Sequence, residues 1–205
     1  MKEIHPYATD SSERDQWAIY IAIVAIIVGY GLHIFIEAYH QAVPLWLWWI
    51  EIPGPIGVYL ALRAWMDESG WTWVVFHKMR WVRIPNLAGT WRGKVKSSFD
   101  QMATEYDCTI VIKQTWTRIA IVLSTRNSRS ENLVAGILIN GVDEATLVYE
   151  FRNEPTADAP AKMEGHHGHA TLRLERGEGE DTLVGEYYSG RGRLNIGTMC
   201  VKRRR

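Results

Sequence analysis

The stretch IPNLAGTWRG, residues 84–93, carries a Gly-x-Trp pattern, Gly89 to Trp91, at the start of an alternating apolar and polar run. This pattern, followed by more such runs, is typical of the first strand of a small β-barrel. Residues 17–62, well before it, are almost purely apolar. The sequence therefore combines a β-rich C-terminal part with an N-terminal part that has the composition of a membrane anchor.

The β-rich part contains short alternating runs separated by turn residues such as Asn140-Gly141 and Gly190-Arg191-Gly192. Eight runs are predicted to be strands: 88–97, 105–114, 117–124, 132–140, 144–152, 168–175, 182–189 and 194–203. Residues 153–167 are polar and contain proline, which predicts a long loop. For residues 84–205 we therefore expect an all-β fold, an eight-stranded antiparallel up-and-down, lipocalin-like β-barrel. Such a barrel has no free sheet edge and leaves room for one small ligand.

The apolar part divides into two segments, each long enough to cross a bilayer. Residues 17–36 contain no Asp, Glu, Lys or Arg, and about 20 such residues span the hydrocarbon core as a helix. Residues 43–62 form a second, less regular segment. The linker between them is short, so residues 17–62 are predicted to form a two-helix transmembrane hairpin.

Lysine and arginine predict the orientation of this hairpin. The tip of the hairpin contains neither. The residues that flank the hairpin are Lys2, Arg14, Arg63, Lys78, Arg80 and Arg83. Both termini are therefore expected in the cytoplasm, with residues 1–16 as an N-terminal tail and residues 84–205 as a tethered cytoplasmic domain. No secretory signal fits, because the apolar run begins late and no small-x-small cleavage site follows it.

Glu51 lies near the middle of the second span, where a carboxylate costs about 2.5–3.5 kcal/mol on insertion scales. A hairpin folded about residues 39 and 40 would place it opposite Val28 and Gly29. Glu51 could be a protonated acid hydrogen-bonded within the hairpin, or a polar contact in an oligomer or pore. Pro53 and Pro55 are expected to kink or break the helix. These three residues are the candidate membrane effector residues.

The connector, residues 63–83, contains apolar residues at helical spacing: Trp71, Val74, Val75, Met79 and Val82. Lys78 and Arg80 lie off this stripe. The pattern predicts an interfacial helix on an anionic leaflet. A linker helix packed on the barrel is the alternative.

Composition limits the classes of function. The chain has 23 basic and 23 acidic residues, and this neutral balance argues against binding a DNA or RNA polymer. Its two cysteines, Cys108 and Cys200, both lie in strand-like runs. Two buried free thiols fit a cytosolic domain better than a disulfide does.

No catalytic motif is evident, so the chain is not predicted to be an enzyme and no cofactor is expected. It has neither a phosphate-binding glycine loop nor a nucleophile elbow. Glu164, His166, His167 and His169 form the one metal-like cluster, but their spacing matches no common zinc motif. They are expected in a solvated loop, with no metal site.

Arginine and aromatic residues in or beside the predicted strands are candidates for ligand contact. Arginine can bind phosphate through two parallel hydrogen bonds, and aromatic faces can stack on bases. The candidate ligand-binding residues are Tyr106, Trp116, Arg118, Tyr149, Arg152, Tyr187, Arg191 and Arg193. A structural role remains open for Arg193, because in lipocalin-like barrels an arginine from a late strand covers the tryptophan that corresponds to Trp91.

The chain resembles the SMODS-associated two-transmembrane, β-strand-rich effectors of bacterial CBASS anti-phage systems. Three segments carry the resemblance: the hairpin at 17–62, IPNLAGTWRGKV at 84–95, and LVGEYYSGRGRLNIGTMCVKR at 183–203. The resemblance implies that the barrel senses a cyclic dinucleotide made by a partner nucleotidyltransferase. It further implies that ligand binding drives homo-oligomerisation, after which the membrane helices disrupt the inner membrane in abortive infection.

Two other functions are weighed against this one. A membrane-tethered carrier or sensor of a lipid would use the barrel as lipocalins do, and an interaction module would have a filled barrel. An apolar lumen would favour the lipid, whereas arginine and tyrosine converging on one cavity would favour the nucleotide.

Overall fold

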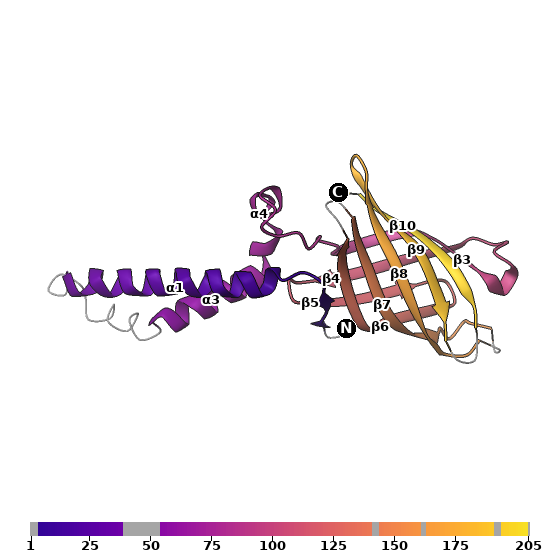
Figure 1. Cartoon of the computed structure of the whole chain (residues 1–205). Helices are drawn as coiled ribbons and strands as arrows, with labels where there is room; N and C mark the ends of the chain where they lie inside the picture. Colours follow the sequence, from indigo (N-terminus) through magenta and orange to yellow (C-terminus); the bar gives the residue numbers. More distant parts are fainter. Residues whose placement is uncertain (1–3, 39–53, 141–143, 161–162, 191–193, 205) are drawn as a thin grey trace. The chain divides into compact units, whose positions relative to one another are not determined.

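The computed structural model describes residues 4–38, 54–140, 144–160, 163–190 and 194–204 (Figure 1). The chain divides into two compact units. The barrel unit comprises residues 1–11 and 84–205, and the helical unit comprises residues 12–83.

The barrel unit is a closed antiparallel β-barrel, as predicted. Its eight strands are β3 Gly89–Ser97, β4 Tyr106–Gln114, β5 Arg118–Ser124, β6 Ser128–Asn140, β7 Glu144–Pro155, β8 His166–Arg176, β9 Glu180–Ser189 and β10 Ile196–Arg204. Each strand pairs with the next along the chain, and β10 pairs with β3 to close the barrel. The up-and-down order follows from the short connections between successive strands.

Alternation along each strand builds the core. In β4, Cys108, Ile110 and Ile112 are buried, whereas Val111 between them is 38% exposed. In β8, Ala170 and Leu172 are fully buried. Successive side chains of a strand point to opposite faces, so each apolar alternate joins the interior of the barrel.

The predicted loop at residues 153–167 is confirmed in its middle but is shorter at both ends. β7 continues to Pro155 and β8 begins at His166, with Asn153 paired to His166. β6 likewise begins at Ser128, four residues before the predicted start. These strand ends are polar on their inward face, so their composition resembles that of a loop although they remain paired.

Residues 5–9, within the predicted N-terminal tail of 1–16, form part of the barrel wall. β1 His5–Pro6 pairs antiparallel with β5, and β2 Ala8–Thr9 pairs parallel with β6. The intervening Tyr7 is 4% exposed, and its hydroxyl donates to the carbonyl of Trp116 at 2.8 Å. We call residues 5–10 the N-terminal wedge.

The wedge fills a gap between β5 and β6. These two strands pair directly only at Val122–Glu131, Leu123–Ser130 and Ser124–Arg129. Asn132 marks the point where they separate: its Oδ1 accepts from the amide of Ile121 at 2.8 Å, and its Nδ2 lies 2.8 Å from Nε2 of His5. Beyond Asn132 the wedge supplies the backbone hydrogen bonds that the two strands no longer exchange.

The helical unit begins with α1 Glu13–Ala38, 26 residues long, in which an 18-residue window has a mean hydropathy of 2.4. Among the described residues, α1 is the one helix long and apolar enough to cross a membrane. It begins four residues before the predicted span, so the predicted tail of 1–16 is divided between the wedge and this helix.

A second helix, α3 Gly54–Glu68, packs against α1. A Cβ on Gly29 would lie 2.7 Å from Cγ of Pro55, which shows how closely the two helices approach. Pro55 lies in the first turn of α3, where its missing N–H costs no helical hydrogen bond. Glu51 and Pro53 lie outside the described residues.

The connector does not form the single interfacial helix that the sequence predicted over 63–83. α3 continues to Glu68, and two short helices follow, η2 Gly70–Thr72 and α4 Val74–Lys78. Trp71 and Val82 of the predicted stripe are buried, whereas Val74 is 77% exposed. The stripe is therefore divided between two environments.

Aromatic packing explains why the connector folds back. The Trp17 ring on α1 lies 5.0 Å from that of Phe76, and its indole N–H donates to the carbonyl of Trp81 at 3.1 Å. The buried carboxylate of Glu13 accepts from both the amide and Nε of Arg83 at 2.9 and 3.1 Å. The first turn of α1 is thus fastened to the last residue of the helical unit.

Candidate functional site

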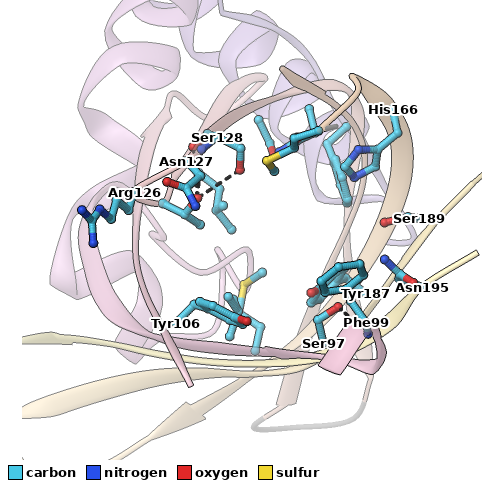
Figure 2. Close-up of a pocket in the computed structure, with 18 of the residues that line it drawn as sticks. Ser97, Phe99, Tyr106, Arg126, Asn127, Ser128, His166, Tyr187, Ser189 and Asn195 are labelled. Carbon is cyan, nitrogen blue, oxygen red and sulfur yellow. Dashed lines mark hydrogen bonds between the residues drawn. The ribbon is translucent and has the colours of Figure 1, made fainter. Parts of the chain in front are cut away.

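One end of the barrel holds a cavity of about 810 Å³ (Figure 2). It lies where β3, β5, β7 and β9 end and where β4, β6, β8 and β10 begin. The lining includes Ser97 at the end of β3, residues 125–127 between β5 and β6, and Asn195 before β10. This end is therefore the open mouth of the barrel.

Buried polar side chains concentrate in this cavity. Seven polar or charged residues are buried within the described parts of the chain, and four of them line the cavity: Ser128, Ser130, Asn153 and Ser189. Burying a polar group is costly unless it finds a hydrogen-bond partner. Such a concentration fits a ligand that has polar edges.

Aromatic side chains supply the apolar surface of the same cavity. Tyr149 and Phe151 of β7 are buried, with ring centroids 6.1 Å apart, and Phe151 packs edge-on against His166 at 6.4 Å. Burial raises the pKa of the Tyr149 hydroxyl, so this group stays protonated and can donate. Flat rings beside hydroxyl and amide groups suit a heterocyclic base.

The rim of the cavity carries charge of both signs. Arg126 lies in the β5–β6 turn, and Glu105 and Asp107 lie at the start of β4. Lys94 and Lys96 bind the Glu105 carboxylate at 2.7 and 3.2 Å, and the hydrogen bond from Lys94 is the main cause of its lowered pKa. The charge of Glu105 is thus partly neutralised by the two lysines.

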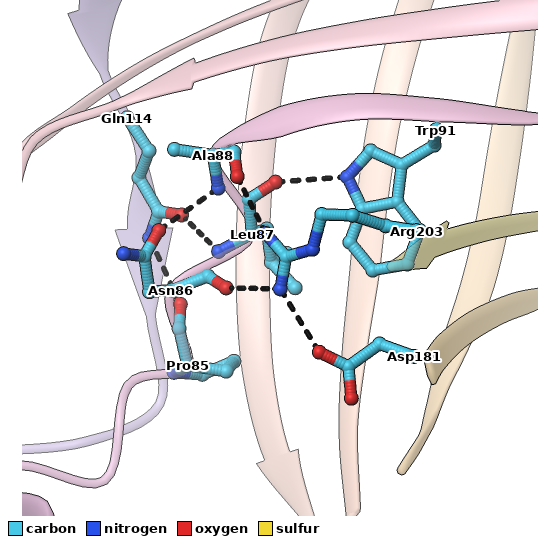
Figure 3. A network of polar contacts seen from close by, with 8 residues as sticks. All are labelled: Pro85, Asn86, Leu87, Ala88, Trp91, Gln114, Asp181 and Arg203. Carbon is cyan, nitrogen blue, oxygen red and sulfur yellow. Dashed lines mark hydrogen bonds and ion pairs between the residues drawn. The ribbon is translucent and has the colours of Figure 1, made fainter. Parts of the chain in front are cut away.

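The opposite end of the barrel is closed by a structural network (Figure 3). The Arg203 guanidinium lies 4.4 Å from the ring centroid of Trp91 and donates to Asp181 Oδ2 and to the carbonyl of Asn86, each at 3.0 Å. The Trp91 indole donates to the carbonyl of Leu87 at 2.9 Å. The arginine that covers Trp91 is therefore Arg203, ten positions beyond the Arg193 that the sequence suggested.

Three of the predicted ligand-binding residues, Tyr106, Tyr149 and Tyr187, line the cavity. They come from β4, β7 and β9, so the fold brings together positions far apart in the sequence. The Tyr187 hydroxyl donates to the carbonyl of Lys96 at 3.2 Å, which fixes its ring beside the mouth.

Three others lie away from the cavity. Trp116 is buried beside Tyr7, and Arg118 begins β5 opposite Pro6, both at the closed end. Arg152 is 61% exposed on the outer face and pairs with Glu154 at 2.9 Å. Its neighbours Phe151 and Asn153 both face inward, so the parity of β7 turns Arg152 outward. Arg191 and Arg193 lie outside the described residues.

Sequence reasoning missed the serines and the asparagine of the lumen, and also Arg126. Ser128 and Ser130 share one parity on β6, and Tyr149, Phe151 and Asn153 share one parity on β7. These residues could have been found in the sequence by continuing the row of inward-facing positions of β6 and β7 into the polar ends of the two strands. Because those strand ends were predicted to be loops, the row was not followed to its end.

In the candidate cluster of Glu164, His166, His167 and His169, the histidines are split between the two faces of β8. His166 faces the cavity, whereas His169 lies on the outer face and stacks on Tyr188 at 5.4 Å. Within the described ranges, no group of three or more His, Cys, Asp or Glu is placed to hold a metal ion.

The sequence can be compared with known proteins on this basis. The profile of the family described as Cap15, cyclic dinucleotide receptor domain, matches residues 82–203. CD-NTase-associated protein 15 of Yersinia aleksiciae is 29% identical over 149 residues, which cover 72% of this chain and 68% of that protein. The matched residues run from just before the Gly-x-Trp pattern to the arginine that covers Trp91. The chain belongs to the Cap15 cyclic dinucleotide receptor domain family.

Proposed function

We propose that this protein is a membrane-anchored receptor and effector of a CBASS anti-phage system, activated by a cyclic dinucleotide from a partner nucleotidyltransferase. The polar and aromatic cavity at the barrel mouth is the observation that carries the proposal. Its volume of about 810 Å³ lies within the roughly 300–1,000 Å³ typical of small-molecule sites. The family assignment supports the same ligand class. The proposal assigns binding, not catalysis, to the barrel.

A lipid ligand is favoured less, because of the same cavity. Acyl chains cannot form hydrogen bonds. They would displace water from the buried Ser130, Asn153 and Ser189 without offering these polar groups a hydrogen-bond partner in its place. A nucleotide offers both flat faces and polar edges. A filled barrel, the remaining alternative, is not what the structure contains.

The wedge supports a hairpin with both termini on one side of the membrane. Residues 4–11 belong to the same compact unit as residues 84–204, so both stand on one side. The intervening chain must then cross the bilayer an even number of times. α1 provides one crossing, and a second must follow between Ala38 and Arg83. The lysines and arginines that flank the hairpin favour the cytoplasm as the side on which both termini lie. In a bacterial CBASS system, the membrane would then be the inner membrane.

Activation requires that the ligand bind the assembled state better than the free one. Anchoring in a membrane raises the effective concentration of barrels, so modest contacts suffice for homo-oligomerisation. The helices, Glu51 and the region of Pro53 and Pro55 would then disrupt the phospholipid bilayer. Glu51 would contribute a polar contact formed between hairpins.

Thermal unfolding of the full chain in detergent, with cyclic di-AMP, cyclic di-GMP, cyclic di-UMP and a long-chain fatty acid, tests the proposal. A cyclic dinucleotide at a hundredfold excess over Kd should stabilise the barrel by about 2.7 kcal/mol. Arg126→Ala, at the rim, should weaken this effect several-fold. Arg118→Ala, at the closed end, is the matched control and should not. Stabilisation by the fatty acid alone would overturn the proposal in favour of the carrier.

A further inference from the structure

Asn153 carries a buried hydrogen-bond acceptor for which the described residues provide no donor. Its side chain is 5% exposed and lines the cavity, and its Nδ2 donates to Oγ of Ser130 at 2.8 Å. Its Oδ1 is buried and has no hydrogen-bond partner. Most buried polar atoms in proteins are paired, so an unpaired one in a ligand cavity calls for an explanation.

Asn132 shows that this barrel can satisfy a buried asparagine when the role is structural. Its Oδ1 accepts from the amide of Ile121, and its Nδ2 meets His5, so both ends of the amide are bound. Asn132 and Ser130 are two positions apart on β6, and Ser130 pairs directly with Asn153. The two asparagines are close neighbours in the same wall, yet only Asn153 leaves an oxygen unpartnered.

The charge of the lining indicates which part of a nucleotide would reach Asn153. The described lining residues include one arginine, Arg126 at the rim, and no lysine. The buried groups around Asn153 are neutral: the Ser128 and Ser130 hydroxyls and the Phe151 ring. Phosphate is therefore favoured at the rim, and a base is favoured within the lumen.

We propose that Asn153 reads the edge of a ligand base by accepting a hydrogen bond from a base N–H group at Oδ1. Ser130 is the positioning residue, because its bond to Nδ2 holds the amide so that the oxygen remains available to the ligand. The inference rests on the proposed function and deepens it, since it selects bases that present an N–H donor.

Binding of the full chain in detergent to the cyclic dinucleotides named above tests this assignment. Each is compared with a counterpart in which the base N–H donors are removed or methylated. In the parent protein, loss of the donor should weaken binding roughly tenfold, as expected for one hydrogen bond to a buried acceptor. In Asn153→Leu, both ligands should bind equally, at about the affinity of the parent for the donor-free counterpart. Such a cycle isolates the contact between Asn153 and the base.

Two further variants separate ligand reading from a structural role. Asn132→Leu should lower the unfolding temperature but keep the tenfold preference for the donor. Ser130→Ala should lose the preference, because the amide can then turn either end toward the base. A preference retained in Asn153→Leu would overturn the assignment while leaving the proposed function intact. Failure of the parent to bind any of the cyclic dinucleotides would overturn both.

Discussion

At the scale of single residues, strand parity decides whether a side chain meets the cavity or the solvent. Arg152 and Asn153 are neighbours in the sequence, but the first pairs with Glu154 outside and the second lines the lumen. The sequence shows the alternation, and so it predicted Tyr149 in the site. It does not show where a strand ends, and this is why Arg152 was favoured over Asn153.

The two cysteines also lie on opposite sides of the barrel wall, one buried and one exposed, so their thiols should differ in reactivity. The prediction of free thiols is confirmed, but only Cys108 is buried, whereas Cys200 is exposed. Burial, with a smaller effect of Asp107, raises the pKa of Cys108 to about 12. At pH 8 its thiolate fraction is then roughly one in ten thousand, and the thiolate is the reactive form.

A maleimide should therefore label the native protein once per chain, at Cys200, and the unfolded protein twice. Cys200→Ser should abolish native labelling, as mass spectrometry would show. Because the unfolded thiol ionises near its ordinary pKa of 9.0, pH above about 9 should also favour unfolding. Rapid native labelling of Cys108 would contradict the burial described here.

At the scale of elements, the eight barrel strands could be predicted and the wedge could not. Strands of 7 to 13 residues carry several periods of alternation, which is enough to show a buried face. β1 and β2 have 2 residues each and carry no period. Their place depends on a gap between β5 and β6 that arises only when the barrel has formed. The prediction of one helix in the connector failed for a similar reason. The contacts of Trp17 with Phe76 and Trp81 outweigh the helical spacing of residues 71–82.

The wedge should contribute measurably to stability through Tyr7. Tyr7→Ala removes a buried ring and should destabilise the barrel by about 3 kcal/mol. Tyr7→Phe removes only the hydroxyl that binds Trp116 and Gln114, and should cost about 1–2 kcal/mol. Thermal unfolding followed by circular dichroism measures both. Tyr188→Ala, at an exposed tyrosine of β9, is the control; if Tyr7→Ala cost no more than this control, the wedge would not be part of the barrel in solution.

At the scale of the whole molecule, the chain leaves the barrel unit after Ser11 and returns at Ile84. The helical unit is therefore an insertion between the wedge and the rest of the barrel. Any change in α1 or α3 reaches the barrel along two covalent paths. The Glu13–Arg83 pair fastens these paths together inside the helical unit.

The proposed hairpin, which crosses the membrane an even number of times, predicts on which side of the membrane each helix ends. Glu37, exposed near the end of α1, should face the periplasm, and Glu68, exposed at the end of α3, should face the cytoplasm. In a chain with both native cysteines replaced by serine, Glu37→Cys should react with a membrane-impermeant maleimide in spheroplasts. Glu68→Cys should react only after permeabilisation. Equal labelling of the two from outside would contradict the hairpin.

The wedge also sets an order of events during synthesis. His5 leaves the ribosome early, but its partner Ile119 follows 114 residues later, after the whole helical unit has been made. Until then the first strand of the barrel wall has nothing to pair with, and contacts so distant along the chain form late. Under the proposed function, the helical unit can enter the bilayer while residues 5–10 are still unpaired. A newborn chain thus completes its barrel only after residues 12–83 have been translated, and under the proposed function the receptor cannot respond to its ligand before these residues have been made.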